Sequence, residues 1–512
     1  MLVKTFGSAI YGVSAITITV EVSVEAGVNF MIVGLPDNAV KESQQRIQSA
    51  LVQCGHHIPQ RHVVINMAPA DIRKEGSAYD LPLAIGIIAA DGQMSSEHLG
   101  EYVIMGELSL DGSLRPIKGA LPMAIEARKR KFKGLILPHD NAREAAIVNN
   151  LTVYGADNIQ QVIDHLNGTK PIEATVVDTR AEFARNLDQY EFDFADVKGQ
   201  EEIKRALEIA AAGGHNVILI GPPGSGKTML AKRLPSILPP LSLEESLETT
   251  QIHSVAGKMR KEDSLIAVRP FRAPHHTVSD VALVGGGTTP QPGEISLAHN
   301  GVLFLDELPE FKRSVLEVLR QPMEERRVTI SRAKMTTEYP AAFMLVAAMN
   351  PCPCGYYNHP SIECTCNPGA VNKYLNKISG PLLDRIDLHI EVTPLPHSAL
   401  AEKKLGEPSA VIRQRVIAAR KIQEERYKGY KGIHCNAQMN QKLFRQWCDI
   451  DAECQELMKN AMDRLGLSAR AYDRILKVAR TIADLEGAPD ITTTHLSEAI
   501  NYRSLDRDNW GR

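Results

Sequence analysis

Hydrophobic and polar residues alternate near the start of the chain in the way that a half-buried strand requires. From residue 16 to residue 24 the even-numbered positions are apolar and the odd-numbered positions are polar, so one face should be buried. Similar patterns predict strands at residues 29–33, 62–67 and 102–110, the last entering a tight turn at Asp111-Gly112. Helical patterns fall at residues 39–52, 81–90, 122–130 and 159–166. Residues 1–172 are therefore expected to form an α+β domain.

The pattern changes after this domain. Residues 173–190 are polar without a regular period, which indicates a linker. Short continuous apolar runs, typical of buried parallel strands, then occur at residues 217–220, 302–305 and 343–348. They predict an α/β core over residues 191–397. Residues 398–512 are almost wholly helical, and within 468–485 an apolar stripe lies beside a basic face of Arg470, Arg474 and Lys477.

The strongest chemical signal follows the first of these apolar runs. Residues 221–228 read GPPGSGKT and precede a predicted helix. In a phosphate-binding loop of this kind the glycines let backbone N–H groups face the phosphates, the lysine reaches the β and γ phosphates, and the threonine ligates Mg²⁺. The residues expected to bind the nucleotide are Gly221, Pro222, Pro223, Gly224, Ser225, Gly226, Lys227 and Thr228. The alternative, an ordinary glycine-rich turn, does not account for all eight positions.

Two carboxylates end the apolar run at 302–305. Asp306 is expected to hold Mg²⁺ through water, and Glu307 to orient and deprotonate the attacking water. The next apolar run leads to Asn350, whose amide could bind the γ phosphate or its water. Arg385, within GPLLDRID at 380–387, could act on the γ phosphate of a neighbouring subunit. Taken alone, Arg385 fits a surface ion pair better.

Four of the eight cysteines fall within fifteen residues, at Cys352, Cys354, Cys364 and Cys366. Four thiolates can close a tetrahedral Zn²⁺ site, although C-x-C is tighter than the usual spacing. Reduced thiols packed in a loop are the alternative, and His359 could replace one thiolate. Ordinary buried thiols are expected at the positions without ligand spacing, which are Cys54, Cys435, Cys448 and Cys454.

Composition narrows the class of protein. With 512 residues, 44% hydrophobic and 23% charged, the chain should be folded and have two or three domains. Lys and Arg number 58 against 61 Asp and Glu, a net charge of -3, so any nucleic-acid binding must use local patches. The longest apolar stretch is too short to cross a bilayer, and the N-terminus lacks the pattern of a secretory signal. We therefore expect a cytoplasmic protein without a membrane partner.

The motifs together resemble those of AAA+ ATPases of the magnesium-chelatase-like branch, most closely the ComM/YifB family. They are GPPGSGKT at 221–228, FRAPHHTVSD at 271–280, GVLFLDELPEF at 301–311, AAMNPCPCG at 347–355, GPLLDRIDLH at 380–389 and SARAYDRILKVARTIADL at 468–485. The resemblance implies an AAA+ P-loop core followed by a C-terminal helical lid. It also implies that Asn350 is sensor 1, Arg385 the arginine finger and Arg470 sensor 2, with Arg474 as the alternative for sensor 2.

The same resemblance implies a function. It predicts a homo-hexamer that couples Mg²⁺-dependent ATP hydrolysis to movement of single-stranded or branched DNA, as a helicase or branch-migration motor in recombination or natural transformation. Two pore-facing elements are expected, a helix-2 insertion at residues 271–293 and a hairpin at 326–339. The hairpin's basic residues could track a phosphate backbone, or could simply be solvated; they are Arg326, Arg327, Arg332 and Lys334. One rival function is a protein-remodelling or metal-chelatase-type chaperone. Another is an ATP-switched scaffold with little turnover, and the intact Glu307 argues against this second rival.

Residues 1–172 resemble the Lon-protease domain, which has a fold like domain 2 of ribosomal protein S5. The likeness lies in KEGSA at 74–78 and in residues 106–119. The positions of that family's nucleophilic serine and catalytic lysine hold Ala78 and Leu121, while Ser77 and Lys118 are displaced by one and three residues. Without a hydroxyl and an amine in place, we expect no peptidase activity. A substrate-binding, pore-extending or oligomerising role is expected, with a second basic patch at 128–133.

Overall fold

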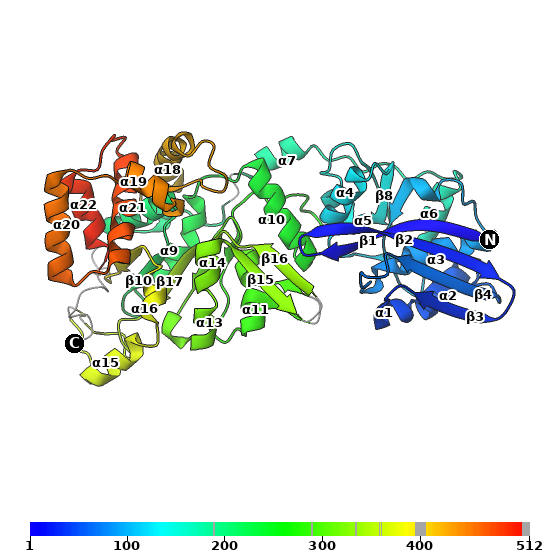
Figure 1. Cartoon of the computed structure of the whole chain (residues 1–512), viewed down its shortest axis with the longest axis horizontal. Coiled ribbons are helices and arrows are strands. Elements are labelled where there is room, and N and C mark those ends of the chain that lie inside the picture. The colour runs from blue at the N-terminus through cyan, green and yellow to red at the C-terminus, as the bar shows by residue number, and fades with distance from the viewer. Residues whose placement is uncertain are drawn as a thin grey trace.

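The computed structural model describes residues 1–187, 190–287, 290–332, 335–357, 359, 361–394 and 406–503. The molecule is elongated, with an N-terminal α/β unit at one end, a second α/β unit in the middle and a group of helices at the other end (Figure 1). A seven-stranded sheet forms the first unit and a five-stranded sheet the second. Among the described residues, every helix is too short or too polar to span a lipid bilayer. The predicted boundary at 397 and 398 lies outside the described residues.

The N-terminal sheet has the strand order β3-β4-β2-β1-β5-β8-β9. The alternation predicted for residues 16–24 is confirmed, because Ile18, Val20 and Val22 are buried in β2 and pack against helices α3 and α4. The strands of this unit are β1 (Leu2–Tyr11), β2 (Ser14–Glu25), β3 (Asn29–Val33), β4 (His62–Ala68), β5 (Tyr102–Ile104), β6 (Glu107–Leu108), β7 (Leu114–Arg115), β8 (Gly134–Pro138) and β9 (Thr152–Ala156). The helices are α1 (Asn38–Lys41), α2 (Ser43–Gln53), α3 (Asp80–Ala90), α4 (Ala120–Lys129), α5 (His139–Ala145) and α6 (Ile159–Leu166).

One prediction for this part of the chain is wrong, and another gains detail. A single strand was expected at 102–110, but the chain leaves the seven-stranded sheet after Ile104, the last residue of β5. Gly106 turns away to exchange backbone hydrogen bonds with Ala78 and Leu81 at the start of α3, so β6 pairs with β7 instead. The segment expected to be a linker contains helix α7 (Thr179–Asn186), which begins where the Asp178 side chain accepts a hydrogen bond from the Ala181 N–H. This capped helix is short and mostly polar, with Ala181, Phe183 and Ala184 as its apolar residues, so it leaves no clear apolar period to detect.

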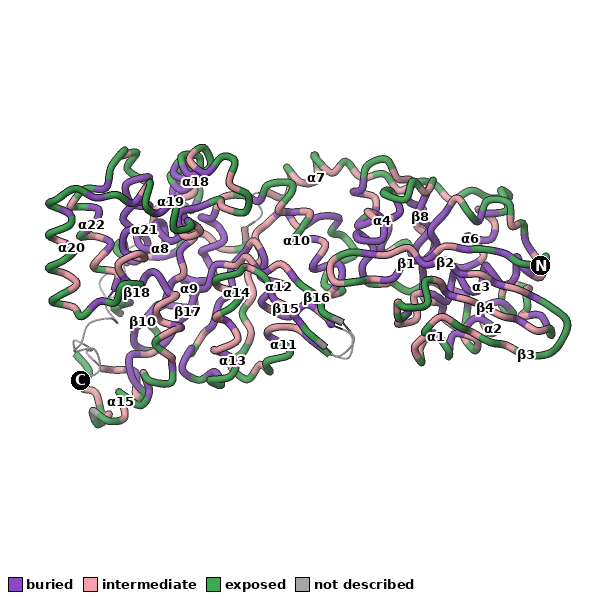
Figure 2. The backbone as a smooth tube through the Cα atoms, viewed as in Figure 1, coloured by how far each residue is buried: buried purple, intermediate pink, exposed green. Residues whose placement is uncertain are grey.

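The central sheet is wholly parallel, in the order β11-β14-β17-β10-β18. It consists of β10 (Val217–Ile220), β11 (Phe271–Arg272), β14 (Val302–Leu305), β17 (Met344–Met349) and β18 (Leu388–Glu391). The three predicted strands match β10, β14 and β17 to within one residue, and all their residues are buried. Val217 and Leu219 pack into one core and Ile218 and Ile220 into another, because successive side chains point to opposite faces. Figure 2 shows this burial running through the middle of the molecule.

Helices and short strands cover this sheet. One face lies under α8 (Glu201–Gly213) and the C-terminal helices, which are α18 (Ser409–Arg426), α19 (Gln441–Trp447), α20 (Ala452–Leu465), α21 (Ala469–Leu485) and α22 (Thr493–Asn501). The remaining helices are α9 (Lys227–Arg233), α10 (Leu243–Ala256), α11 (Asp280–Val284), α12 (Glu294–Leu297), α13 (Arg313–Glu317), α14 (Arg320–Glu325), α15 (Pro368–Leu375) and α16 (Gly380–Leu383). The hairpin predicted at 326–339 is present as β15 (Arg327–Arg332) and β16 (Met335–Pro340), beside the short pair β12 (Gly285–Gly286) and β13 (Gln291–Pro292).

The N-terminal unit touches the central unit at several places, including an ion pair of 2.6 Å between Asp140 and Lys261. The Gly119 N–H, at the start of α4, donates to the Ser254 carbonyl of α10 over 3.0 Å, and the Lys118 side chain lies against Gly257. The tip between β1 and β2 reaches the hairpin, where the Tyr11 hydroxyl lies 3.3 Å from the Thr336 carbonyl (Figure 1). The region around Lys118 is therefore occupied by the central unit, and Leu121 is fully buried. The likeness to Lon proteases and the lack of peptidase activity stay predictions.

Candidate nucleotide-binding site

The phosphate-binding loop (residues 221–228) connects the carboxyl end of β10 to α9. Gly224 and Gly226 have φ values of 77° and 91°, which other residues adopt only with strain. Gly221 lies so close to the Val392 carbonyl that a Cβ atom would overlap it. The Lys227 ammonium lies 2.7 Å from the Gly221 carbonyl oxygen and 2.9 Å from that of Pro222. Burial lowers the pKa of Lys227, and the charge of Asp306 opposes that shift.

The threonine of the loop meets the first acid of β14. The Thr228 hydroxyl donates to Asp306 Oδ2 over 2.7 Å, and Asp306 Oδ1 accepts the backbone N–H of Glu307 at 3.0 Å. A hydroxyl and a carboxylate at one point form the all-oxygen donor set that Mg²⁺ prefers when it bridges to phosphates. These residues therefore fit the Mg²⁺ site expected from the sequence.

Asn350 completes this group at the end of β17. Its Oδ1 accepts a hydrogen bond from the Lys227 ammonium at 3.2 Å. β17 lies between β14 and β10, so the carboxyl ends of all three strands meet at one edge of the sheet. The structure thus brings together five of the predicted site residues, which are Lys227, Thr228, Asp306, Glu307 and Asn350.

The contact of Glu307 with a histidine was not foreseen from the sequence. Glu307 has a φ of 53° and its carboxylate lies 3.2 Å from Nδ1 of His276. The His276 ring packs against those of His275 and Phe311, with centroids 4.1 Å and 6.4 Å away. His276 belongs to the FRAPHH motif, but the only signal of its role was its place shortly after β11, the strand paired with β14.

The three arginines of the predicted site lie at the opposite edge of the sheet. Asn216, directly before β10, donates from Nδ2 to the Arg385 carbonyl over 3.1 Å, whereas the phosphate-binding loop follows β10. A four-residue strand spans about 13 Å, so Arg385 does not reach the loop of its own chain. The Arg385 side chain is 11% exposed, and its guanidinium lies 2.5 Å from the Glu324 carboxylate of α14. Arg470 of α21 is 67% exposed and pairs with Asp384 at 3.2 Å.

Arg474 is held in a buried ion pair. Its Nη1 lies 2.9 Å from Oδ1 of Asp387, whose Oδ2 accepts the Asn216 N–H at 2.8 Å. Burial alone would raise the pKa of Asp387, but the charges of Arg474 and His215 outweigh it and hold this pKa well below its usual range. Burial lowers the pKa of His215. Of the two candidates for sensor 2, Arg470 is therefore the one with a guanidinium exposed to solvent.

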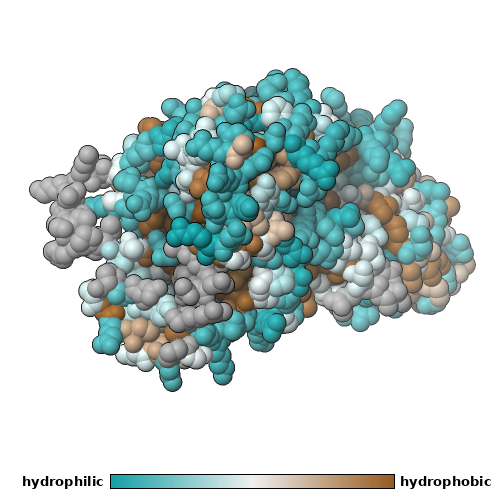
Figure 3. Space-filling model, turned by 60° about the vertical axis from the view of Figure 1, so that its left-hand side comes forward, coloured by the Kyte–Doolittle hydropathy of each residue, from teal (hydrophilic) through white to brown (hydrophobic). Residues whose placement is uncertain are grey.

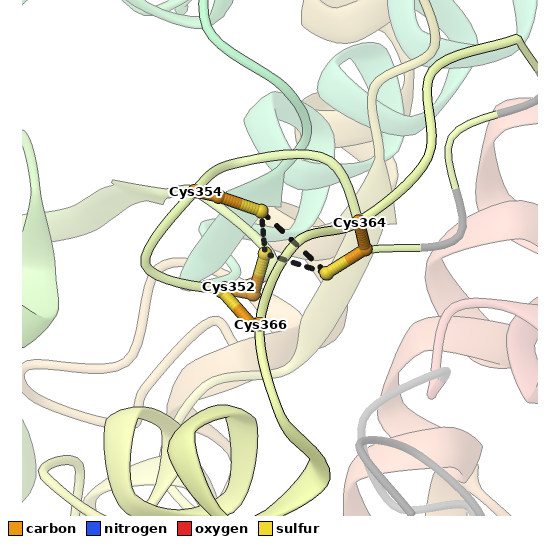
Figure 4. Close-up of side chains that lie close together, drawn as sticks. All are labelled: Cys352, Cys354, Cys364 and Cys366. Atoms are coloured by element: carbon orange, nitrogen blue, oxygen red, sulfur yellow. Dashed lines mark hydrogen bonds between the residues drawn. The ribbon is translucent and has the colours of Figure 1, made fainter.

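The cysteine cluster (Cys352, Cys354, Cys364 and Cys366) brings four sulfur atoms within 4.8 Å of one another. Three of them point toward each other at separations of 3.3, 3.5 and 3.7 Å (Figure 4). Zn–S bonds of about 2.3 Å give a tetrahedron with edges of about 3.8 Å, so a zinc ion fits with small adjustments. His359 is already an acceptor for the Ser361 and Ile362 N–H groups, which makes it a poor substitute ligand.

The other four cysteines lie apart from this cluster. Cys435, Cys448 and Cys454 are buried as predicted, whereas the prediction for Cys54 is wrong because its side chain is only partly buried. It follows α2 at the edge of the N-terminal core.

Two of the hairpin's basic residues have partners within the chain. The Arg326 guanidinium donates to the Gly432 carbonyl at 2.6 Å, and Arg327 lies 3.6 Å and 3.4 Å from Glu325 and Glu338. The prediction that the hairpin follows a phosphate backbone stays a prediction. The two acids beside Arg327 come from α14 and from the paired strand β16.

Two other basic residues of the hairpin, Lys334 and the side chain of Arg332, lie outside the described residues. In the second basic patch, Arg128, Lys129 and Lys131 are exposed at the end of α4. On the face shown in Figure 3 hydrophilic side chains predominate. A basic, hydrophilic surface suits a partner that is itself charged or polar.

The fold and the site define a P-loop protein of the magnesium-chelatase-like AAA+ class. Residues 193–400 match the family described as magnesium chelatase, subunit ChlI, residues 20–141 match subunit ChlI of Mg-chelatase, and residues 406–503 match the C-terminal region of that subunit. Matches therefore cover the N-terminal unit, the central unit and the C-terminal helices.

Comparison with individual proteins identifies the family within this class. It is 46% identical over 502 residues to the protein YifB of Escherichia coli strain K12, covering 98% of this chain and 96% of that one. It is 44% identical over 508 residues to the competence protein ComM of Haemophilus influenzae, covering 99% and 98%. The magnesium-chelatase 67 kDa subunit of Heliobacterium mobile is 28% identical over 193 residues, covering 32% and 29%. The chain belongs to the YifB/ComM family of magnesium-chelatase-like proteins.

The ion pair of Asp387 predicts a pH-dependent loss of stability. We expect Asp387→Asn to lower the free energy of unfolding by about 3 kcal/mol at pH 7, because breaking a buried pair strands its partner. The pKa is depressed in the folded state, so the stabilisation is complete above the unfolded-state pKa of about 3.9 and is lost as the pH falls further. Urea unfolding should show the difference from wild type shrinking below about pH 4. Asp463→Asn, at an exposed position of α20, is the control, and equal stability of the two variants at pH 7 would contradict the assignment.

Proposed function

We propose that this protein hydrolyses ATP with Mg²⁺ and uses the energy to move DNA. The observation that carries the proposal is the convergence of Lys227, Thr228, Asp306, Glu307 and Asn350 on one edge of a parallel sheet. Phosphoryl transfer needs positioned charge more than covalent chemistry, and this set supplies each part. Its geometry suits nucleoside triphosphate hydrolysis better than nucleotide binding alone, because Glu307 offers a general base.

Each residue has a distinct role in this proposal. Lys227 neutralises charge on the β and γ phosphates, and Thr228 and Asp306 hold the Mg²⁺ that bridges them. Glu307 orients the attacking water and accepts its proton. Asn350 donates its amide to the γ phosphate or to that water, as sensor 1.

Hydrolysis is proposed to require a ring of six identical chains. Arg385 and Arg470 lie at the edge of the sheet remote from their own phosphate-binding loop, so they could complete only the site of another protomer. A trans arginine that neutralises transition-state charge accelerates such reactions by roughly 10³- to 10⁵-fold. In this assembly Arg385 would exchange Glu324 for the neighbour's γ phosphate.

DNA is the proposed substrate. One support is the relative named competence protein ComM, which suggests a role in natural transformation. The other is the set of exposed basic side chains at the end of α4, which are Arg128, Lys129 and Lys131. These contacts would bind the DNA backbone and not read its sequence. The action would be translocation or branch migration of single-stranded or branched DNA in the cytoplasm, and the four-cysteine cluster would hold a structural zinc ion.

A second candidate function is that of a protein-remodelling or chelatase-type chaperone. It is favoured by the matches to magnesium chelatase subunits, which span all three parts of the chain. The two functions share the ATP chemistry and differ only in what is moved, so the polymer that stimulates hydrolysis separates them.

The test measures ATP binding and hydrolysis with and without forked or four-way DNA. We expect Lys227→Ala to abolish nucleotide binding, and Glu307→Gln to bind ATP but hydrolyse it at least 100-fold more slowly, in line with the loss of a general base. Lys232→Ala, an exposed lysine on the same helix, should behave like wild type. If an unfolded protein stimulates hydrolysis and DNA neither binds nor stimulates, the DNA proposal fails and the chaperone function replaces it.

The contact between His276 and Glu307 leads to a further expectation. The His276 imidazole contacts the Glu307 carboxylate, which is the group proposed to accept a proton from water. Removing this contact frees the carboxylate, so His276→Ala should raise the DNA-independent rate of ATP hydrolysis several-fold. His275→Ala is the matched control, because the neighbouring ring bonds to Thr277 instead. An unchanged or lower rate in His276→Ala would show that this contact does not restrain Glu307.

A further inference from the structure

The cysteine cluster adjoins the nucleotide site through the backbone. Cys352 comes two residues after Asn350 and is fully buried. Gly355 comes directly after Cys354, and its N–H donates to the Cys352 carbonyl over 3.0 Å. The turn that carries the first two thiols is therefore continuous with the residue proposed to sense the γ phosphate.

This turn also packs against the phosphate-binding loop. Gly355 has a φ of 86°, and a Cβ atom placed on it would lie 2.5 Å from Cδ and 2.9 Å from Cγ of Pro223. Contacts below 3.0 Å do not occur between real Cβ atoms and their neighbours. Proline has little freedom to move aside, so a displacement of the turn displaces the loop.

The chain segment that carries Cys364 and Cys366 also leads to a contact near Asn350. Cys366 is followed by α15, and Tyr374 of this helix lies near the backbone of Asn350. Tyr374 is 8% exposed and packs in the core beside β17. Both chain segments that supply thiols are thus anchored at Asn350, one by direct continuity and the other through Tyr374.

We propose that a zinc ion held by Cys352, Cys354, Cys364 and Cys366 acts as a clamp that positions Asn350 and Pro223 for ATP. Four thiolate bonds join the two segments at a single point, and thiol protons are released as the metal binds. Without the ion, weak thiol contacts replace the four metal bonds between the segments, and Asn350 and the loop lose part of their common support. The affinity for nucleotide therefore depends on zinc, although no cysteine touches the nucleotide. The inference rests on the proposed ATP site.

The first experiment measures zinc content and binding of a fluorescent ATP analogue in the full chain, purified under reducing conditions without chelator. Wild type and Cys54→Ser should each hold about one zinc ion per chain. Cys364→Ser should lose it and bind the analogue at least 10-fold more weakly. Less than a fifth of an equivalent of zinc in wild type overturns the proposal, and so does unchanged affinity in zinc-free Cys364→Ser. Failure of wild type to bind the analogue at all would instead refute the proposed ATP site.

The second experiment leaves every thiol in place. Gly355→Ala should keep about one zinc ion but lose at least 10-fold in analogue affinity, because its methyl group pushes against Pro223. Gly429→Ala is the matched control, since Gly429 also has a positive φ, of 91°, and an added Cβ there meets nothing within 4 Å. A zinc-loaded Gly355→Ala that binds the analogue as tightly as Gly429→Ala overturns the proposed coupling.

Discussion

The parallel pairing of β10, β14 and β17 is the constraint on which the rest of the structure depends. Ile220 is paired with Met349, and Leu305 with Ala347, so the three strands end almost level. Each strand is buried on both faces, and the free energy of removing this apolar surface from water holds the register. Since the polar residues follow directly after the strand ends, the same register that buries the core also assembles the site.

The sheet also divides the proposed chemistry between its two edges. The carboxyl edge carries the groups for the phosphates and Mg²⁺, and the amino edge carries Arg385 and Arg470. Asp387 anchors the second group, because it ties Arg474 of α21 to the start of β10 through a buried ion pair. In the proposed assembly each protomer would contribute half of a site on each side. The ion pair that places α21 also sets the position of the exposed Arg470.

Contacts between the elements give the site connections beyond the sheet. Glu307 is held by His276, and that histidine lies on the segment that leads from β11 to α11 and the β12–β13 pair. The hairpin β15–β16 stands beside these elements and touches the tip of the N-terminal β1–β2 ladder. A polymer that moved the hairpin would therefore act on elements attached both to the N-terminal unit and to Glu307, the proposed general base.

The sequence by itself determined the features that depend on short stretches of chain. The strands β2, β10, β14 and β17 follow from alternation or from continuous apolar runs, and the phosphate-binding loop follows from glycines at fixed spacing, because backbone geometry and burial act locally. Only the tertiary structure decided the break after Ile104, the partners of Arg326 and Arg327, and the contacts of His276 with Glu307 and of Gly355 with Pro223. Most of these contacts join residues distant in the chain, and each depends on where packed elements happen to meet, which no local pattern of hydrophobic and polar residues records.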